Sequence, residues 1–189
     1  MNGRVVRIQE VEIRNLQNVS YGKVKLEKQG DRSVSHAGIL GIYGQNGSGK
    51  TAFIHAVDLL QHILDNEKFS DVAENYIMQG QEEVSLSFVF SVVNAERHYQ
   101  VKYDFSLRRN DISTLEIEQK KPVLHVIKES IKYKYCRDEE WSAWQLLMKS
   151  DVDSRAVFLP AKNVQLLVGR NKSMLDNVRV AKLLAVKQG

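Results

Sequence analysis

Few features that mark secreted or membrane proteins occur in this chain of 189 residues. Its single cysteine, Cys136, has no internal partner for a disulfide, which excludes a disulfide-stapled scaffold and favours a reducing cytoplasm. No apolar run approaches the roughly 20 residues that a membrane-spanning helix needs. The opening residues, MNGRVVRIQEVEIRNL, are charged and alternating, unlike the apolar core of a secretory signal. We therefore expect a cytoplasmic protein without membrane contact.

Linkers and internal repeats are also absent. Only two prolines occur, and no stretch rich in proline, glycine or serine divides the chain. With 43% hydrophobic and 26% charged residues, the composition suits a globular domain. We expect residues 1–189 to belong to one domain, with three segments of different character: 1–80, 81–150 and 151–189.

The first segment predicts strands followed by a helix. β-branched residues and partial alternation predict strands over residues 5–13 and 21–27, separated by a turn. The short apolar run GILGIYG, residues 38–44, is typical of a buried strand. Apolar residues at helical spacing predict a helix over residues 51–64, and a shorter helix is expected before Gly80.

The middle segment has the pattern of an antiparallel sheet. Residues 84–135 contain three stretches in which apolar and polar side chains alternate, and the links between them are short. The three-residue spacing of Trp141, Trp144 and Leu147 predicts one face of a helix that packs into the core. In the third segment, residues 173–186 predict an amphipathic helix.

The most specific signal is the glycine-rich loop, residues 44–51, which reads GQNGSGKT and fits the Walker A pattern G-x-x-x-x-G-K-[S/T] at every fixed position. Glycines let backbone N–H groups approach phosphate oxygens, and the next helix begins with N–H groups that lack internal partners. Lys50 is expected near the β- and γ-phosphates, and the Thr51 hydroxyl on Mg²⁺. The pattern therefore predicts that this loop binds ATP with Mg²⁺. The expected binding residues are Gly44, Gln45, Asn46, Gly47, Ser48, Gly49, Lys50 and Thr51.

The string GIYGQNGSGKTAFIHAV resembles the phosphate loop of ABC-type ATPases, especially the SMC, RecF and OLD-like branch. The order VEIRNLQNV, YGKVKLE, GILGIYGQNGSGKT is similar to the start of that branch, and the closest likeness is to bacterial AAA-family ATP-binding proteins related to OLD nucleases and phage-defence ATPases. The likeness covers about residues 5–110. It implies an α/β fold, in which a P-loop NTPase core of ABC/SMC type carries an antiparallel β-subdomain beside the loop-bearing sheet.

The resemblance also implies further contacts and partners. The turn of residues 15–18 would lie near the nucleotide, with Asn15 and Gln17 as added contacts, although many relatives carry a basic residue where Gln17 stands. Ordinary turn chemistry is the alternative for Asn15 and Asn18. Relatives dimerise head to tail, which implies a homodimer of the intact protein, and a DNA or nuclease partner is a further expectation.

The acidic motif with which such ATPases hydrolyse ATP is missing from the sequence. It would follow a buried strand, with an Asp that supports Mg²⁺ and a Glu that polarises the attacking water. Neither residues 135–140 nor the stretch around Glu129 has that context, and no L-S-G-G signature loop occurs. Gln165 is the one candidate for a γ-phosphate-sensing glutamine, and its sequence context is that of an ordinary surface residue. We therefore expect the N-terminal part of a longer ATPase, which binds nucleotide but turns over little by itself.

Two other functions stay open. A small P-loop kinase would need an Arg-rich lid and a mostly parallel sheet after the first helix. A nucleic-acid-binding or scaffold module with a vestigial loop is favoured by residues 155–189, where seven basic residues oppose Asp176 in a chain of net charge +4. A solvated helix face explains the same charges.

Overall fold

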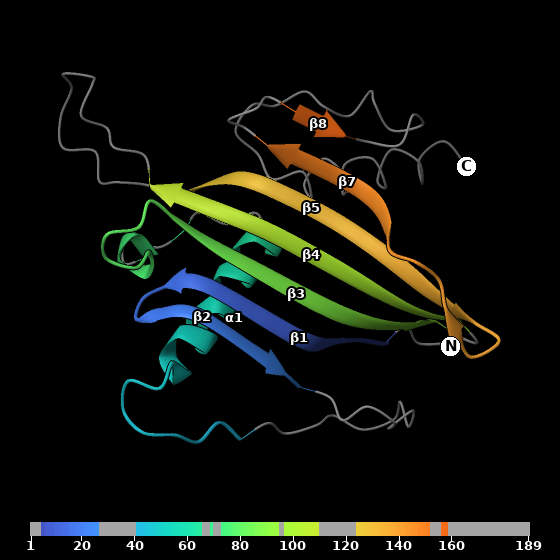
Figure 1. Cartoon of the computed structure of the whole chain (residues 1–189), viewed down its shortest axis with the longest axis horizontal. Coiled ribbons are helices and arrows are strands. Elements are labelled where there is room, and N and C mark those ends of the chain that lie inside the picture. Colours follow the sequence, from blue (N-terminus) through green and yellow to red (C-terminus); the bar gives the residue numbers. More distant parts are fainter. Residues whose placement is uncertain are drawn as a thin grey trace.

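One antiparallel sheet dominates the part of the chain that the structure describes (Figure 1). The structure, a computed structural model, describes residues 5–26, 41–65, 69, 73–94, 97–109, 124–151 and 156–158. The strands are β1 (Val5–Leu16), β2 (Val19–Lys25), β3 (Glu83–Asn94), β4 (Arg97–Arg109), β5 (Leu124–Arg137), β6 (Glu140–Trp141), β7 (Gln145–Asp151) and β8 (Ala156–Phe158). Their order across the sheet is β2-β1-β3-β4-β5-β7-β8, and β6 pairs with β5. Helix α1 (Lys50–Asp65) and the 3₁₀ helix η1 (Ala73–Tyr76) are the described helices.

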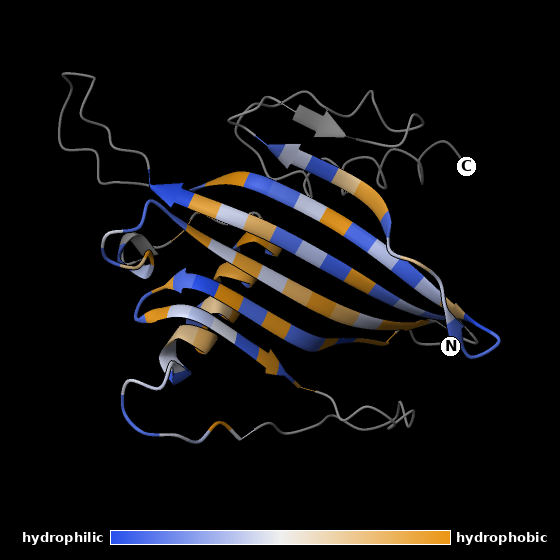
Figure 2. Ribbon diagram, viewed as in Figure 1, coloured by the Kyte–Doolittle hydropathy of each residue, from blue (hydrophilic) through white to orange (hydrophobic). Residues whose placement is uncertain are grey.

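The apolar face of the sheet is built from rows of side chains that cross several strands. One such row is formed by Val11, Phe88, Tyr103, Ile131 and Met148, which face one another on β1, β3, β4, β5 and β7 and are all buried. The alternating bands of colour on the strands in Figure 2 show the same period of two. The core therefore follows from the alternation that the sequence displays.

Helix α1 lies across the apolar face of the sheet (Figure 1). Its buried residues recur at helical spacing and join the same hydrophobic cluster as the strands. They are Ala52, Ala56, Leu59, Leu60 and Ile63. Small residues near its start let the helix approach the sheet closely. The packing of α1 thereby fixes where the glycine-rich loop, which ends in the first turn of α1, stands relative to the strands.

Several expectations from the sequence are confirmed. The helix predicted over residues 51–64 is α1, the two first strands are β1 and β2, and the antiparallel stretch over residues 84–135 is the β3-β4-β5 meander. Residues 173–186 lie outside the described residues.

The prediction of a strand over residues 38–44 is wrong for residues 41–44, the part of this range that the structure describes. Residues 41–45 have no regular secondary structure, and no described strand pairs with them. Their side chains are exposed, including Tyr43 at 93%. A short apolar run predicts a buried strand only when neighbouring strands cover it, and none of the described strands does so.

The helix predicted from Trp141, Trp144 and Leu147 is also wrong. Trp141 lies in β6 and Leu147 in β7, and Trp144 lies in the link between them. Residues Asp138 and Glu139 have φ of 49° and 67°, so β5 and β6 are joined by a two-residue turn of the kind that reverses a hairpin.

The two tryptophans are exposed instead of packed into the core, at 44% for Trp141 and 41% for Trp144. Lys134 Nζ lies 4.9 Å from the ring centroid of Trp141 and 5.0 Å from that of Trp144. This cation–π contact, together with the hairpin turn, accounts for their position without any helix.

The α/β fold that the sequence predicts is seen only in part. Instead of two sheets that abut, the described strands form one continuous antiparallel sheet, because β1 pairs directly with β3. The parallel strands of an α/β core are not among the described residues. Within those residues, no helix is both long enough and apolar enough to cross a membrane.

The central row of the apolar face generates a prediction about stability. Phe88 is fully buried and stacks on Phe105, with ring centroids 6.1 Å apart. Phe88→Ala should lower the free energy of unfolding by about 3–5 kcal/mol, because it leaves a cavity between sheet and helix. The measurement is urea unfolding followed by circular dichroism. Ser87→Ala, on the other face of β3, is the control and should change that free energy by less than about 0.5 kcal/mol; equal effects of both would contradict the assigned faces.

Candidate functional site

Lys50 reaches back across the glycine-rich loop. Its Nζ donates to the carbonyl oxygens of Gly44 and Gln45, both at 2.7 Å, and to Ser48 Oγ at 3.4 Å. The Ser48 N–H donates to the Gln45 carbonyl at 3.2 Å, which closes the loop into a turn. None of these partners is a carboxylate, so the positive charge of Lys50 is not neutralised by the described residues that it contacts. The loop therefore encloses a cation that can attract an anion.

Helix α1 begins directly after this cation. The Phe53 N–H donates to the Gly49 carbonyl at 3.0 Å, as the first bond of the helix. The N–H groups of the residues before Phe53 have no partner within the helix. The first turn of α1 contains no acidic residue. Both the free N–H groups and the helix dipole therefore favour an anion at this end.

Gly47 and Gly49 have left-handed backbones, with φ of 82° and 88°. A Cβ added to Gly47 would meet no atom within 4 Å, whereas a Cβ added to Gly49 would lie 2.9 Å from Cγ2 of Val19. The sequence predicts glycine here so that phosphate can approach. At Gly49 the structure adds a second reason, because Val19 at the start of β2 packs against the bare Cα.

The turn between β1 and β2 is held by bonds to residues 76–78. The Gln17 N–H donates to the Tyr76 carbonyl at 2.7 Å, and the Met78 N–H donates to the Asn15 carbonyl at 2.9 Å. Leu16, fully buried, forms an isolated bridge with Ile77. These contacts stabilise left-handed backbones at Asn15 and Gln17, with φ of 57° and 53°.

The same turn also holds the glycine-rich loop. Asn18 Nδ2 donates to the Gly47 carbonyl at 2.7 Å, across 29 residues of sequence. The Asn15 side chain points elsewhere, to Gln81 Oε1 at 3.3 Å and the Glu83 carbonyl at 3.4 Å. The sequence singled out Asn15 and Gln17 as contacts and treated Asn18 as a turn residue. The structure instead brings Asn18 to the loop, while contacts of Asn15 and Gln17 with a nucleotide stay a prediction.

The Thr51 hydroxyl is available to act as a metal ligand. Thr51 is exposed, and no hydrogen bond from its side chain to another described residue is recorded. A free hydroxyl beside a cation and a helix N-terminus is suited to bind Mg²⁺ together with phosphate oxygens, since Mg²⁺ uses few protein ligands. Within the described ranges, no group of three or more His, Cys, Asp or Glu side chains could hold a metal ion.

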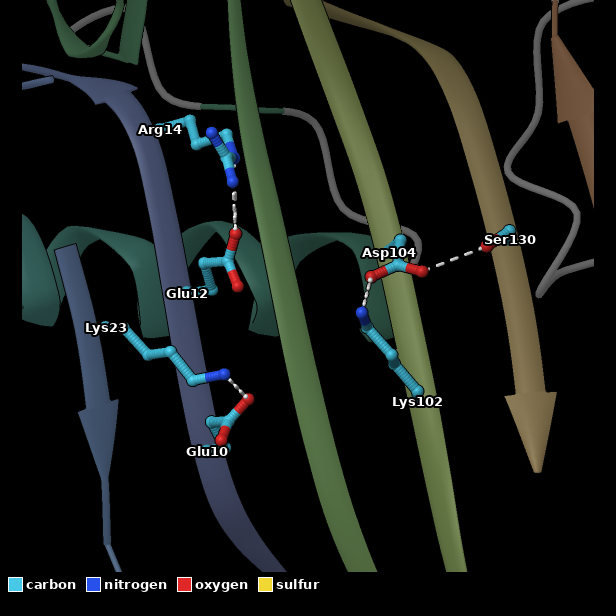
Figure 3. A network of polar contacts seen from close by, with 7 residues as sticks. All are labelled: Glu10, Glu12, Arg14, Lys23, Lys102, Asp104 and Ser130. Carbon is cyan, nitrogen blue, oxygen red and sulfur yellow. Dashed lines mark hydrogen bonds and ion pairs between the residues drawn. The ribbon is translucent and has the colours of Figure 1, made fainter. Parts of the chain in front are cut away.

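The polar face of the sheet carries a hollow of about 320 Å³ that contains no residue of the glycine-rich loop. Its floor is crossed by the row Glu12, Ser87, Asp104, Ser130 and Lys149. Figure 3 shows that charges on this face pair with one another. The recorded distances are 2.8 Å for Arg14 to Glu12 and 3.4 Å for Lys102 to Asp104.

A similar pair lies beside this hollow, where the Lys23 ammonium donates to the Glu10 carboxylate at 2.7 Å (Figure 3). That hydrogen bond raises the pKa of Lys23. Because cations and anions balance on the polar face, it offers no preference for a phosphate ligand. We therefore place the candidate site at the loop and not in the hollow.

The carboxylates nearest in sequence to an acidic motif do not contact the loop. Asp138 is 89% exposed in the β5–β6 turn. Glu129 is buried on the apolar face of β5 and accepts a hydrogen bond from the Tyr103 hydroxyl. Gln165 and residues 155–189 fall outside the described residues, apart from the strand β8. A catalytic carboxylate is thus not assigned.

Comparison with known proteins identifies a family whose model this chain matches. Residues 39–147 match the family whose description reads "AAA domain, putative AbiEii toxin, Type IV TA system". The match covers more than half of the chain and includes the glycine-rich loop, α1 and the β3-β4-β5 meander. No curated protein matches the chain.

The contact between Val19 and Gly49 generates a prediction with built-in controls. Gly47, Gly49 and Gly80 share similar left-handed φ, but only Gly49 faces an atom that a Cβ would strike. Each Gly→Ala change should cost about 1–2 kcal/mol of unfolding free energy from backbone strain, and Gly49→Ala should cost about 1–3 kcal/mol more from the clash. Urea unfolding of the three variants measures the difference.

A second substitution should relieve this clash. Val19→Ala removes the Cγ2 atom, so in that background the extra cost of Gly49→Ala should disappear. If Gly49→Ala costs no more than Gly80→Ala in the wild-type background, Val19 does not pack against Gly49.

Proposed function

Because the chain belongs to the family described as "AAA domain, putative AbiEii toxin, Type IV TA system", a family of P-loop ATPase type, we propose that it binds ATP with Mg²⁺ through its glycine-rich loop. Lys50 and the backbone N–H groups of Gly47 and of residues 49–51 hold the β- and γ-phosphates, and Thr51 contributes a ligand to Mg²⁺. The loop is then a Walker A motif in function as well as in pattern.

The observation that carries this proposal is the environment of the Lys50 ammonium. It contacts two backbone carbonyls and one hydroxyl, at 2.7 to 3.4 Å, and no carboxylate. Because none of these partners carries a negative charge, no described carboxylate competes with a ligand for the ammonium. A triphosphate supplies a counterion directly at the positive end of α1.

Bound Mg²⁺ would neutralise charge that develops on the phosphates during phosphoryl transfer. The protein's own contribution is to position the phosphates: the loop is already closed by the bond between Ser48 and Gln45, and it is held from outside by Asn18. A loop that is ordered before the ligand arrives loses less conformational entropy on binding.

We propose that this chain is part of a larger ATPase and that the other part of that ATPase supplies the catalytic acid. Ile42, Tyr43 and Ile54 are 40%, 93% and 61% exposed, and no described strand pairs with residues 41–45. Exposed apolar side chains next to the loop and on α1 are ones that further strands of a nucleotide-binding core would cover. The proposal includes a homodimer of the intact protein and a DNA or nuclease partner.

The small-kinase alternative is less well supported. The residues after α1 form the antiparallel β3-β4-β5 meander instead of the mostly parallel sheet of such kinases. A nucleic-acid-binding module with a vestigial loop remains the second candidate function, because its basic segment, residues 155–189, lies almost wholly outside the described residues. Affinity for DNA that ignores ATP and survives Lys50→Ala would favour it.

Calorimetric titration of Mg-ATP into the wild-type chain and into Lys50→Ala tests the proposed function. The variant should bind roughly tenfold more weakly or worse, because it loses charge-assisted hydrogen bonds to the phosphates. Lys149→Ala, an exposed lysine of β7 at the far side of the sheet, is the matched control and should bind like the wild type. Equal affinity of all three proteins, or no binding by any of them, would contradict the proposal.

The role of Thr51 has a separate test, in which the affinity for ATP is measured with Mg²⁺ and with a chelator. The wild-type chain should bind more tightly with Mg²⁺, and Thr51→Ala should lose most of that difference while its affinity in chelator stays unchanged. Ser48→Ala removes another hydroxyl from the same loop and should keep the Mg²⁺ effect. If both variants respond to Mg²⁺ as the wild type does, Thr51 is not a ligand.

A further inference from the structure

Asn18 is the only described residue outside the glycine-rich loop and α1 whose side chain has a recorded hydrogen bond to that loop. Its Nδ2 donates to the Gly47 carbonyl at 2.7 Å, which is a normal length for a good amide hydrogen bond. The bond joins a strand turn to the middle of the loop, where the Gly47 carbonyl shares its peptide with the Ser48 N–H. It therefore constrains the orientation of the Gly47–Ser48 peptide.

The turn that presents Asn18 is itself held firmly. Its backbone is bonded to Tyr76 and Met78, and Leu16 is buried within it. Beside Asn18, Val19 lies against Gly49 so closely that no Cβ would fit. The loop thus meets the turn at two points, a hydrogen bond at Gly47 and a packing contact at Gly49. The loop is thus attached to a turn that is itself bonded to residues 76 and 78.

The peptide that this turn orients lies in the loop that is expected to bind phosphate. A carbonyl and the N–H of the same peptide point in opposite directions, so fixing the Gly47 carbonyl on Asn18 directs the Ser48 N–H away from the strand turn and toward the Gln45 carbonyl, the bond that closes the loop. In a phosphate-binding loop, N–H groups have to converge on the anion while carbonyls point away. An outside donor on a loop carbonyl favours that arrangement before the ligand arrives.

We propose that Asn18 is a positioning residue for phosphate binding, which holds the glycine-rich loop in its anion-binding conformation without touching the ligand. This role rests on the proposed function of the loop. It predicts a weaker affinity for any ligand that carries a polyphosphate, whatever its base, because the contact acts on the loop. It also predicts little change in overall stability, since Asn18 is exposed and its bond contributes nothing to the core.

The variant that tests this role is Asn18→Leu, which keeps the side-chain shape and removes the donor. Isothermal titration should show a roughly three- to tenfold weaker affinity, as expected for one hydrogen bond to a neutral acceptor. The factor should be the same for Mg-ATP, Mg-GTP and inorganic tripolyphosphate. The urea midpoint of the variant should match that of the wild type.

Gln81→Ala is the matched control. It removes a side-chain hydrogen bond to the same turn, from Asn15 Nδ2 to Gln81 Oε1 at 3.3 Å, and it leaves Asn18 in place. Its affinity for the three ligands should equal that of the wild type. Loss of affinity that follows a fall in the urea midpoint, in either variant, would assign these residues to folding and overturn the positioning role.

Two negative results remain distinct from each other. If the wild type binds all three ligands and Asn18→Leu binds them equally well, the role of Asn18 is wrong and the proposed function stands. If the wild type binds none of them, the proposed function fails and the role of Asn18 fails with it. A loss for Mg-ATP alone, with tripolyphosphate unchanged, would overturn the role by placing Asn18 at the base instead of the loop.

Discussion

The contact between the β1–β2 turn and the glycine-rich loop is the constraint on which the candidate site depends. Val19 packs against the Cα of Gly49, and Asn18 donates to Gly47. The sheet fixes the turn, the turn fixes the loop, and the packing of α1 on the sheet fixes the far end of the loop. A segment of glycines, which by itself would sample many conformations, is thereby confined to one.

This arrangement separates the stability of the fold from the chemistry of the site. The free energy of folding comes from apolar rows on one face of the sheet and from the buried residues of α1. The loop adds little to that core, and its polar groups remain exposed. The charges on the opposite face are paired among themselves, so the one cation held only by neutral groups in the loop, Lys50, is well placed to attract a polyphosphate.

Sequence reasoning succeeded where a pattern is local. Helical spacing located α1 to within a residue at each end, and alternation located the β3-β4-β5 meander. It failed at Trp144, because a two-residue turn without glycine gave no warning of a hairpin. It also placed the turn of residues 15–18 near the nucleotide without predicting that Asn18 bonds to the loop itself. The partner of Asn18 lies 29 residues away, and such a contact depends on strand pairing that no local pattern encodes.

The central claim is that the loop is a phosphate site already shaped by the strand turn. A crystal structure with Mg²⁺ and a non-hydrolysable ATP analogue tests it most directly. The account predicts phosphate oxygens on the N–H groups of Gly47 and of residues 49–51, Lys50 Nζ moved from the Gly44 and Gln45 carbonyls to a phosphate, and the bond from Asn18 to Gly47 intact. An analogue bound elsewhere, or a loop that breaks its bond to Asn18 in order to bind, would contradict it.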